Sequence, residues 1–209
     1  MENLSLKVCG MREPDNIAGL VKIAPDFIGL IFYPKSARYV RNLDNREAIA
    51  SIPEHINRVG VFVNDTLESV IKTVDDYQLD YVQLHGGEST EYCRSLKSQG
   101  IKIIKVFSVQ DKLNMQLLKT FEGEVDYYLF DTKTSTYGGS GKTFDWSILK
   151  DYEMNTPYFL SGGIGLDELK KLDRSQFPKL VGLDVNSKFE DNPGHKNLER
   201  VEILKKIIS

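Results

Sequence analysis

Short apolar runs rich in valine, isoleucine and aromatic residues alternate along the chain with longer segments that carry apolar residues at helical spacing. This alternation is typical of repeated strand–helix units. Eight strands are predicted, and they begin near Leu4, Asp26, Arg58, Asp80, Lys102, Asp126, Pro157 and Leu180. Eight units without an antiparallel signature favour a closed (β/α)8 TIM barrel, and an open doubly wound sheet is the structural alternative.

Three of the predicted helices begin with residues that commonly cap helix N-termini. They cover residues 65–77, 89–99 and 197–208, and Gly100 follows the second as a stop signal. The intervals after the second and sixth strands are longer than the other five, which leaves room for substantial loops there. The length of 209 residues suits one closed barrel, so residues 1–209 are expected to form a single α/β domain.

Strand parity predicts which side chains enter the barrel, because neighbouring residues on a strand face opposite layers. In the first strand, Leu4, Leu6 and Val8 form an apolar set that the helices should cover, which turns Lys7 and Cys9 inward. The same interpretation places these polar side chains inward: Gln83, His85, Lys105, Asp131 and Asp184. Active sites of this fold lie at the carboxyl-terminal ends of the strands, so the polar residues there are candidates for a site.

Cys9 and Asp131 are the candidates for proton transfer. A buried cysteine is most often a packing residue, but a thiol at the rim near Lys7 is expected to have its pKa lowered toward neutrality and to serve as a base or nucleophile. Asp131 precedes a long glycine-rich loop, which is either a lid over a substrate or an ordinary surface loop. The segment GGSGKT in this loop lacks the first glycine of an ATP-binding P-loop, because Thr136 stands there.

Two further loops contain candidate binding groups. Gly162 and Gly163 follow the seventh strand, and in barrels the loops after strands seven and eight commonly form a phosphate cradle from backbone N–H groups. The segment FYPKSARYV after strand two carries Lys35, Arg38 and Arg41. These cations are either solvated surface charges or a basic loop that binds a carboxylate, for which arginine has a suitable bidentate geometry.

Charge and composition restrict the partners that we expect. A net charge of −3 and a pI near 5.7 do not favour nucleic acid or a membrane surface. No segment approaches the ~18 apolar residues of a membrane helix, and no export signal is visible, so a cytoplasmic protein is predicted. Cys9 and Cys93 are therefore expected to be free thiols. With three histidines, of which only His85 is placed at the rim, no metal site is predicted.

Seven segments in order resemble the phosphoribosylanthranilate isomerase family of tryptophan biosynthesis. They are KVCG, DFIGLIFYPKSARYV, RVGVFVN, VQLHGGES, LFDTKTSTYGGSGKTFDW, FLSGGIG and GLDVNSKFEDNPGHKN. The resemblance implies a (β/α)8 barrel without a cofactor. It also implies an Amadori rearrangement of N-(5-phosphoribosyl)anthranilate to 1-(2-carboxyphenylamino)-1-deoxyribulose 5-phosphate.

The same resemblance implies roles for individual residues. Asp131 would protonate the furanose ring oxygen, Cys9 would remove the C2 proton, Arg38 would hold the anthranilate carboxylate and Asp184 would contact substrate hydroxyls. The expected phosphate amides surround Gly162, Gly163, Ser187 and Lys188, and Gln83 and His85 are further expected substrate contacts. The family commonly has Ser-Ser-Gly where Asn186, Ser187 and Lys188 stand, so Lys188 either hinders a backbone turn that needs a positive φ or attracts the phosphate.

Other functions compete with this prediction. One is another phosphosugar barrel, such as a relative of indole-glycerol-phosphate synthase or an isomerase that also accepts a related ribonucleotide. The latter would usually have an aspartate in place of Cys9. A phosphometabolite-binding module without turnover is the alternative from a different class, and it would need neither Cys9 nor Asp131. The partner is expected to be a small phosphoribosyl compound, and both a monomer and a homodimer are compatible with the sequence.

Overall fold

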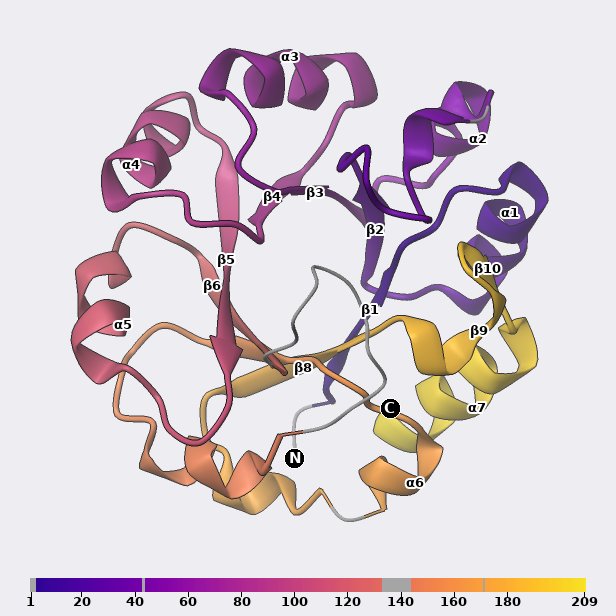
Figure 1. Cartoon of the computed structure of the whole chain (residues 1–209). Helices are drawn as coiled ribbons and strands as arrows, with labels where there is room; N and C mark the ends of the chain where they lie inside the picture. The colour runs from indigo at the N-terminus through magenta and orange to yellow at the C-terminus, as the bar shows by residue number, and fades with distance from the viewer. Residues whose placement is uncertain (1–2, 43, 133–143, 171) are drawn as a thin grey trace.

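The computed structural model describes residues 3–42, 44–132, 144–170 and 172–209. Eight parallel strands pair in chain order, and the pairing of β1 with β8 closes them into a barrel (Figure 1). The strands are β1 Ser5–Cys9, β2 Phe27–Ile31, β3 Asn57–Phe62, β4 Tyr81–Leu84, β5 Lys102–Val109, β6 Tyr127–Thr132, β7 Tyr158–Leu160 and β8 Leu180–Val185. The predicted (β/α)8 barrel is thereby confirmed and the open sheet is excluded.

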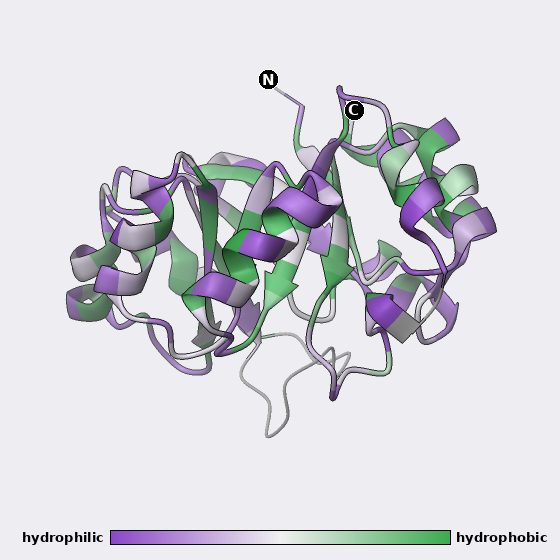
Figure 2. Cartoon of the chain, turned by 90° about the horizontal axis from the view of Figure 1, so that it is seen from above, coloured by the Kyte–Doolittle hydropathy of each residue, from purple (hydrophilic) through white to green (hydrophobic). Residues whose placement is uncertain are grey.

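Helices surround the barrel and face the strands with their apolar sides. The α-helices are α1 Pro14–Ile23, α2 Arg46–Ala50, α3 Leu67–Tyr77, α4 Thr90–Ser98, α5 Met115–Phe121, α6 Leu166–Leu169 and α7 Leu198–Ile208. Short 3₁₀ helices are η1 Val40–Asn42, η2 Trp146–Asp151, η3 Arg174–Gln176 and η4 Ser187–Phe189. Figure 2 shows apolar residues concentrated along the strands and polar residues on the outer helix surfaces. In the described part of the β6–β7 connection, η2 stands where an α-helix was expected.

The three predicted helices are present as α3, α4 and α7. The side chains of Ser89 and Asn197 accept hydrogen bonds from backbone amides at the starts of α4 and α7, as their capping role requires. The cap of α3 is Thr66 rather than Asp65, since the Thr66 hydroxyl accepts from the amide of Ser69. Beyond α4 the chain turns at Gly100, which has a φ of +77°.

The amino-terminal end of the barrel interior is filled by four aromatic side chains, which we call the aromatic plug. The plug consists of Phe27, Tyr81, Tyr127 and Phe159, whose neighbouring ring centroids lie 5.2–6.5 Å apart, mostly edge to face. Strand parity is confirmed for β1, because Leu6 and Val8 join the core between barrel and helices while Lys7 and Cys9 face inward. The interior is therefore apolar at one end and polar at the other.

The inward placement of Lys105 was wrong. Its neighbours Ile104 and Val106 belong to the interior cluster, so Lys105 faces the helix layer. There its ammonium lies 2.9 Å from a carboxylate oxygen of Glu88, with both side chains almost fully buried. The pair compensates the charge that makes a lone buried lysine costly, which is why a polar residue is tolerated on that face.

A short antiparallel hairpin, absent from the predicted pattern, separates β8 from α7. It consists of β9 Glu190–Asn192 and β10 His195–Lys196, joined by a turn in which Gly194 has a φ of +87°. The hairpin lies beside α1 and α7 (Figure 1). It places Glu190 and Lys196 next to the carboxyl-terminal rim of the barrel.

Candidate active site

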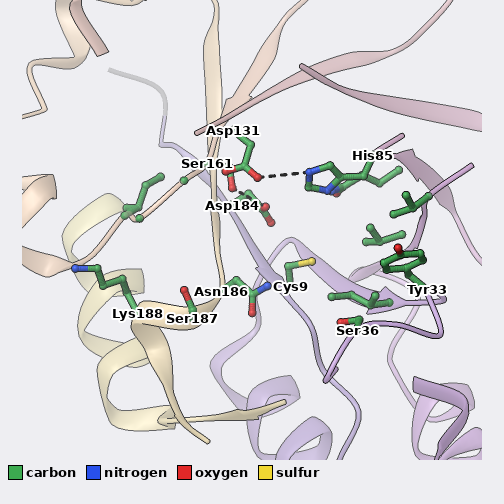
Figure 3. A pocket seen from close by; sticks show the side chains of 17 residues that line it. Cys9, Tyr33, Ser36, His85, Asp131, Ser161, Asp184, Asn186, Ser187 and Lys188 are labelled. Carbon is green, nitrogen blue, oxygen red and sulfur yellow. Dashed lines mark hydrogen bonds and ion pairs between the residues drawn. The ribbon is translucent and has the colours of Figure 1, made fainter. Parts of the chain in front are cut away.

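A pocket lies at the carboxyl-terminal rim of the barrel and opens to solvent (Figure 3). Nine of the ten predicted site residues line it: Cys9, Gln83, His85, Asp131, Gly162, Gly163, Asp184, Ser187 and Lys188. Arg38 lies next to it, since its amide donates to the hydroxyl of the pocket residue Ser36. The structure thus brings together predicted residues from six of the eight strand-and-loop units of the barrel.

Cys9 is a free thiol, buried but in contact with the pocket. Burial raises the pKa of the thiol, and the ammonium groups of Lys7 and Lys196 oppose this effect without cancelling it. The predicted lowering of the Cys9 pKa toward neutrality was therefore wrong, because the sequence identified the neighbouring cation but not the extent of desolvation. Lys7 and Lys196 are thus the groups that favour the thiolate form against burial.

Lys7 and Asp184 form a buried ion pair across the β1–β8 seam. The Lys7 ammonium lies 2.7 Å from one carboxylate oxygen of Asp184, and the hydroxyl of Ser161 donates to the other at 3.0 Å. Burial opposes the charge of Lys7, but Asp184 and Cys9 outweigh it and the pKa of Lys7 is raised. Both oxygens of Asp184 are thus oriented, and each keeps a lone pair that can accept from a ligand hydroxyl.

Asp131 is the penultimate residue of β6 and lies on the opposite side of the pocket from Cys9 (Figure 3). One of its oxygens accepts from the amide of Thr132 at 2.8 Å, and the other lies 3.5 Å from Nε2 of His85. Its side chain is 20% exposed, so a substrate can reach the carboxyl group. The glycine-rich loop that follows, including the predicted lid, lies outside the described residues.

Gly162 and Gly163 form the turn after β7 with φ values of +87° and +67°. In the described part of the chain, neither amide donates a hydrogen bond to another protein group. The facing loop after β8 begins with η4, which contains Ser187 and Lys188. Lys188 lies in this 3₁₀ helix and has no positive φ, so the predicted conflict with a turn does not arise, and its side chain is exposed at the rim.

Arg38 is held by a residue that the sequence reasoning missed. Its guanidinium donates to both oxygens of Glu190, from Nε at 2.8 and 3.1 Å and from Nη2 at 2.6 Å. Lys196, also missed, contacts the same carboxylate. The turn signal Pro193–Gly194 could have indicated a hairpin that returns these side chains to the rim.

The other predicted cations of the β2 loop do not join the site. Arg41 donates to the hydroxyl of Thr73 and lies over the rings of Phe32 and Tyr77 in the helix layer, while Lys35 is exposed. Among the described residues there is no group of three or more His, Cys, Asp or Glu side chains placed to hold a metal ion. Within the same residues, no helix is long and apolar enough to cross a bilayer.

Known proteins identify the family. The sequence model of the N-(5'-phosphoribosyl)anthranilate isomerase family matches residues 6–206 of this chain. The isomerase of Parabacteroides distasonis is 44% identical over 199 residues, which cover 94% of this chain and 90% of the relative. The crystal structure of phosphoribosyl anthranilate isomerase from Thermotoga maritima superposes with a TM-score of 0.83 at 35% identity, covering 97% of both chains. A second isomerase structure, in complex with reduced 1-(o-carboxyphenylamino)-1-deoxyribulose 5-phosphate, gives a TM-score of 0.81 at 30% identity with the same coverage. The chain therefore belongs to the phosphoribosylanthranilate isomerase family of tryptophan biosynthesis.

Proposed function

We propose that Asp131 and Cys9 carry out the isomerase reaction of this chain as general acid and general base, without a cofactor. The observation that carries the proposal is their placement at the ends of β6 and β1, facing each other across one pocket (Figure 3). Opening a furanose ring needs a proton donor, and enolamine formation needs a proton acceptor at C2. Two groups on opposite walls serve both steps on one bound substrate.

In the proposed sequence, Asp131 first protonates the ring oxygen of N-(5-phosphoribosyl)anthranilate, and the C1–O bond breaks to give an open-chain Schiff base. The thiolate of Cys9 then removes the proton from C2, and the electron pair moves to form the enolamine. Tautomerisation of the enolamine gives the ketone product. The ring oxygen that Asp131 protonated becomes a hydroxyl, so one proton leaves the acid and one arrives at the base.

The two ends of the substrate would be held by different loops. We assign the phosphate to the amides around Gly162, Gly163, Ser187 and Lys188, supported by the two glycine amides that have no protein acceptor among the described residues. The exposed ammonium of Lys188 adds a positive charge at the same rim. Arg38 would receive the anthranilate carboxylate through Nη1, which has no partner in the described part of the chain.

The central part of the substrate would contact the floor of the pocket. The oxygen Oε1 of Gln83 is buried and lacks a hydrogen-bond partner among the described residues, so a ligand hydroxyl would satisfy it. Asp184, oriented by Lys7 and Ser161, offers acceptor positions to the ribose hydroxyls. His85, which lies beside Asp131, would contact the same part of the substrate.

The proposal is tested by following the loss of fluorescence of freshly prepared phosphoribosylanthranilate with wild type, Cys9→Ala and Asp131→Asn. Each variant is expected to lose about 10²- to 10⁴-fold in kcat/KM while keeping its thermal midpoint. Cys93→Ala is the matched control, because that cysteine is buried in α4 away from the pocket and should leave kcat/KM unchanged. Activity within tenfold of wild type in either site variant would refute the assignment of that residue.

The proposed chemistry also bears on location. A base at Cys9 has to remain a reduced thiol, and both cysteines are free in the structure. We therefore propose that the protein works in the reducing environment of the cytoplasm. Monomer and homodimer both remain compatible with these features.

A further inference from the structure

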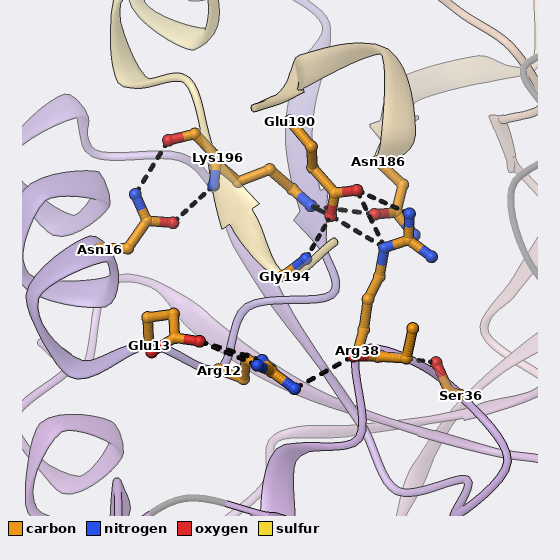
Figure 4. A network of polar contacts seen from close by, with 10 residues as sticks. Arg12, Glu13, Asn16, Ser36, Arg38, Asn186, Glu190, Gly194 and Lys196 are labelled. Carbon is orange, nitrogen blue, oxygen red and sulfur yellow. Dashed lines mark hydrogen bonds and ion pairs between the residues drawn. The ribbon is translucent and has the colours of Figure 1, made fainter. Parts of the chain in front are cut away.

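Arg38, Glu190 and Lys196 form a buried cluster beside the pocket, which we call the rim charge cluster (Figure 4). The Glu190 carboxylate accepts from Arg38 at 2.6–3.1 Å, from the Lys196 ammonium at 2.5 Å and from the amide of Gly194 at 3.1 Å. The side chains of Glu190 and Lys196 are 4% and 0% exposed, and that of Arg38 is 13% exposed. The single carboxylate of Glu190 therefore neutralises only one of the two cations Arg38 and Lys196, and the cluster has a net charge of one positive.

Asn186 connects this cluster to the pocket. Its Oδ1 accepts from the Lys196 ammonium at 2.9 Å, and an ammonium can only donate, so this contact fixes the orientation of the amide. Asn186 also lines the pocket, where it lies beside Cys9 (Figure 3). The side chains of Arg38 and Asn186 both pack against Gly10, the residue after Cys9, where an added Cβ would lie 2.7 and 3.0 Å from them.

The charged groups that act on Cys9 come from four elements. Lys7 of β1 lowers the pKa of Cys9, and its ion-pair partner Asp184 of β8 acts in the opposite direction. Arg38 of the β2 loop and Lys196 of β10 act on Cys9 as well, and Glu190 neutralises only one of them. The remaining single positive charge is matched by the single negative charge of a Cys9 thiolate.

We propose that Lys196 is a positioning residue of the reaction: held by Glu190 and Asn186 in the rim charge cluster, it adds to Lys7 a second positive charge that stabilises the Cys9 thiolate. Glu190 holds this charge in place together with Arg38. The inference rests on the proposed role of Cys9 as the base, but it concerns the ionisation of the thiol and can be measured without turnover.

The direction of the pKa changes agrees with this arrangement. Burial raises the pKa of Cys9, while Lys196 is among the groups that lower it. At Lys196 itself burial outweighs the attraction of Glu190, so its pKa is lowered, and a neighbouring thiolate favours its charged form. Thiolate and ammonium thus stabilise one another in a site where each alone is disfavoured.

The test is the rate at which iodoacetamide alkylates Cys9 as a function of pH, followed by the mass of the Cys9 peptide. Lys196→Met removes the charge but leaves Arg38 and Glu190 as a balanced pair. The thiol midpoint is the pH at which half of the Cys9 thiol is ionised. In Lys196→Met we expect the alkylation rate below this midpoint to fall about tenfold or more and the midpoint to move to higher pH. The value of kcat/KM should fall in parallel, with a smaller change in KM.

Lys196→Arg keeps the charge and should keep the alkylation rate within about threefold of wild type. Lys206→Met, which removes an exposed cation on α7, is the matched control and should change neither rate nor midpoint. Lys196→Gln is used in the same way if the methionine variant does not fold. An unchanged thiol midpoint in the neutral variant overturns the proposal even if activity falls. Loss of turnover in Cys9→Ala is a separate result that tests only the role of Cys9.

Discussion

At Gly162 the loop after β7 lies close to the end of β6. A Cβ added to this residue would lie 2.3 Å from Oγ1 and 2.6 Å from the amide nitrogen of Thr132, and 2.9 Å from a carboxylate oxygen of Asp131. Real Cβ contacts essentially never fall below 3.0 Å, so one of the two segments has to move by about 0.7 Å. One of these segments contains the proposed acid and the other the proposed phosphate amides, and Gly162→Ala therefore perturbs both stability and catalysis.

Two contributions can be separated. The φ of Gly162 is +87°, and placing a residue with a Cβ in a left-handed conformation costs roughly 1–2 kcal/mol. The steric overlap adds a displacement approaching the 1 Å at which misplaced catalytic groups lose about 10²-fold in rate. Gly100→Ala isolates the first contribution, because Gly100 has a φ of +77° and an added Cβ there would meet no atom within 4 Å.

The assay compares urea unfolding and kcat for wild type, Gly162→Ala and Gly100→Ala. Gly100→Ala should lose about 1–2 kcal/mol of unfolding free energy and keep its kcat. Gly162→Ala should lose more stability than this control, and its kcat should fall about 10²-fold. Equal stability losses together with a wild-type kcat in Gly162→Ala would refute the reasoning that close approach at this glycine positions Asp131.

Three other predictions concern ionisation, the interior ion pair and the aromatic plug. Because the thiolate is the reactive form and burial raises the pKa of Cys9, the rate at which iodoacetamide alkylates Cys9 should rise about tenfold per pH unit through neutrality and level off only above the ordinary thiol pKa of about 8.5; a plateau below pH 7 would contradict this. Lys7→Met leaves Asp184 as a buried carboxylate without its cation and should lower the unfolding free energy by about 3–5 kcal/mol, against less than about 0.5 kcal/mol for Lys206→Met. Similar losses in urea titrations of the two variants would argue against a structural role of the pair. Phe27→Ala should lower the unfolding free energy by about 3–5 kcal/mol and leave kcat unchanged, whereas a tenfold fall in kcat would show that the plug affects the rim.

Most of the fold follows from periodicity, and the exceptions have physical causes. The first strand alternates between polar and apolar residues, so Lys7 and Cys9 are placed correctly. The fifth strand, KIIKVFSV, is buried on both faces and has adjacent isoleucines, so its parity is ambiguous and Lys105 is misplaced. Nothing local in that strand indicates that its lysine is neutralised by Glu88, since the pairing depends on tertiary structure.

The site is predictable to a similar extent. The pocket residues can be predicted from the strand ends and from the Gly162–Gly163 pair, because the fold brings the carboxyl ends of parallel strands to one rim. The partners of these residues are less visible: Glu190 and Lys196 return to the rim through a hairpin of two short strands, below the length at which alternation is recognisable. The pKa of Cys9 depends on burial and on charges from β1, β8 and β10, which no single segment reveals.

Among the described residues, the aromatic plug fills the end of the barrel opposite the pocket, and the pocket opens at the carboxyl-terminal rim. Substrate must enter and product must leave through the same mouth, in turn. Product that has not yet dissociated excludes the next substrate molecule, and the enzyme should therefore show competitive inhibition by its own product.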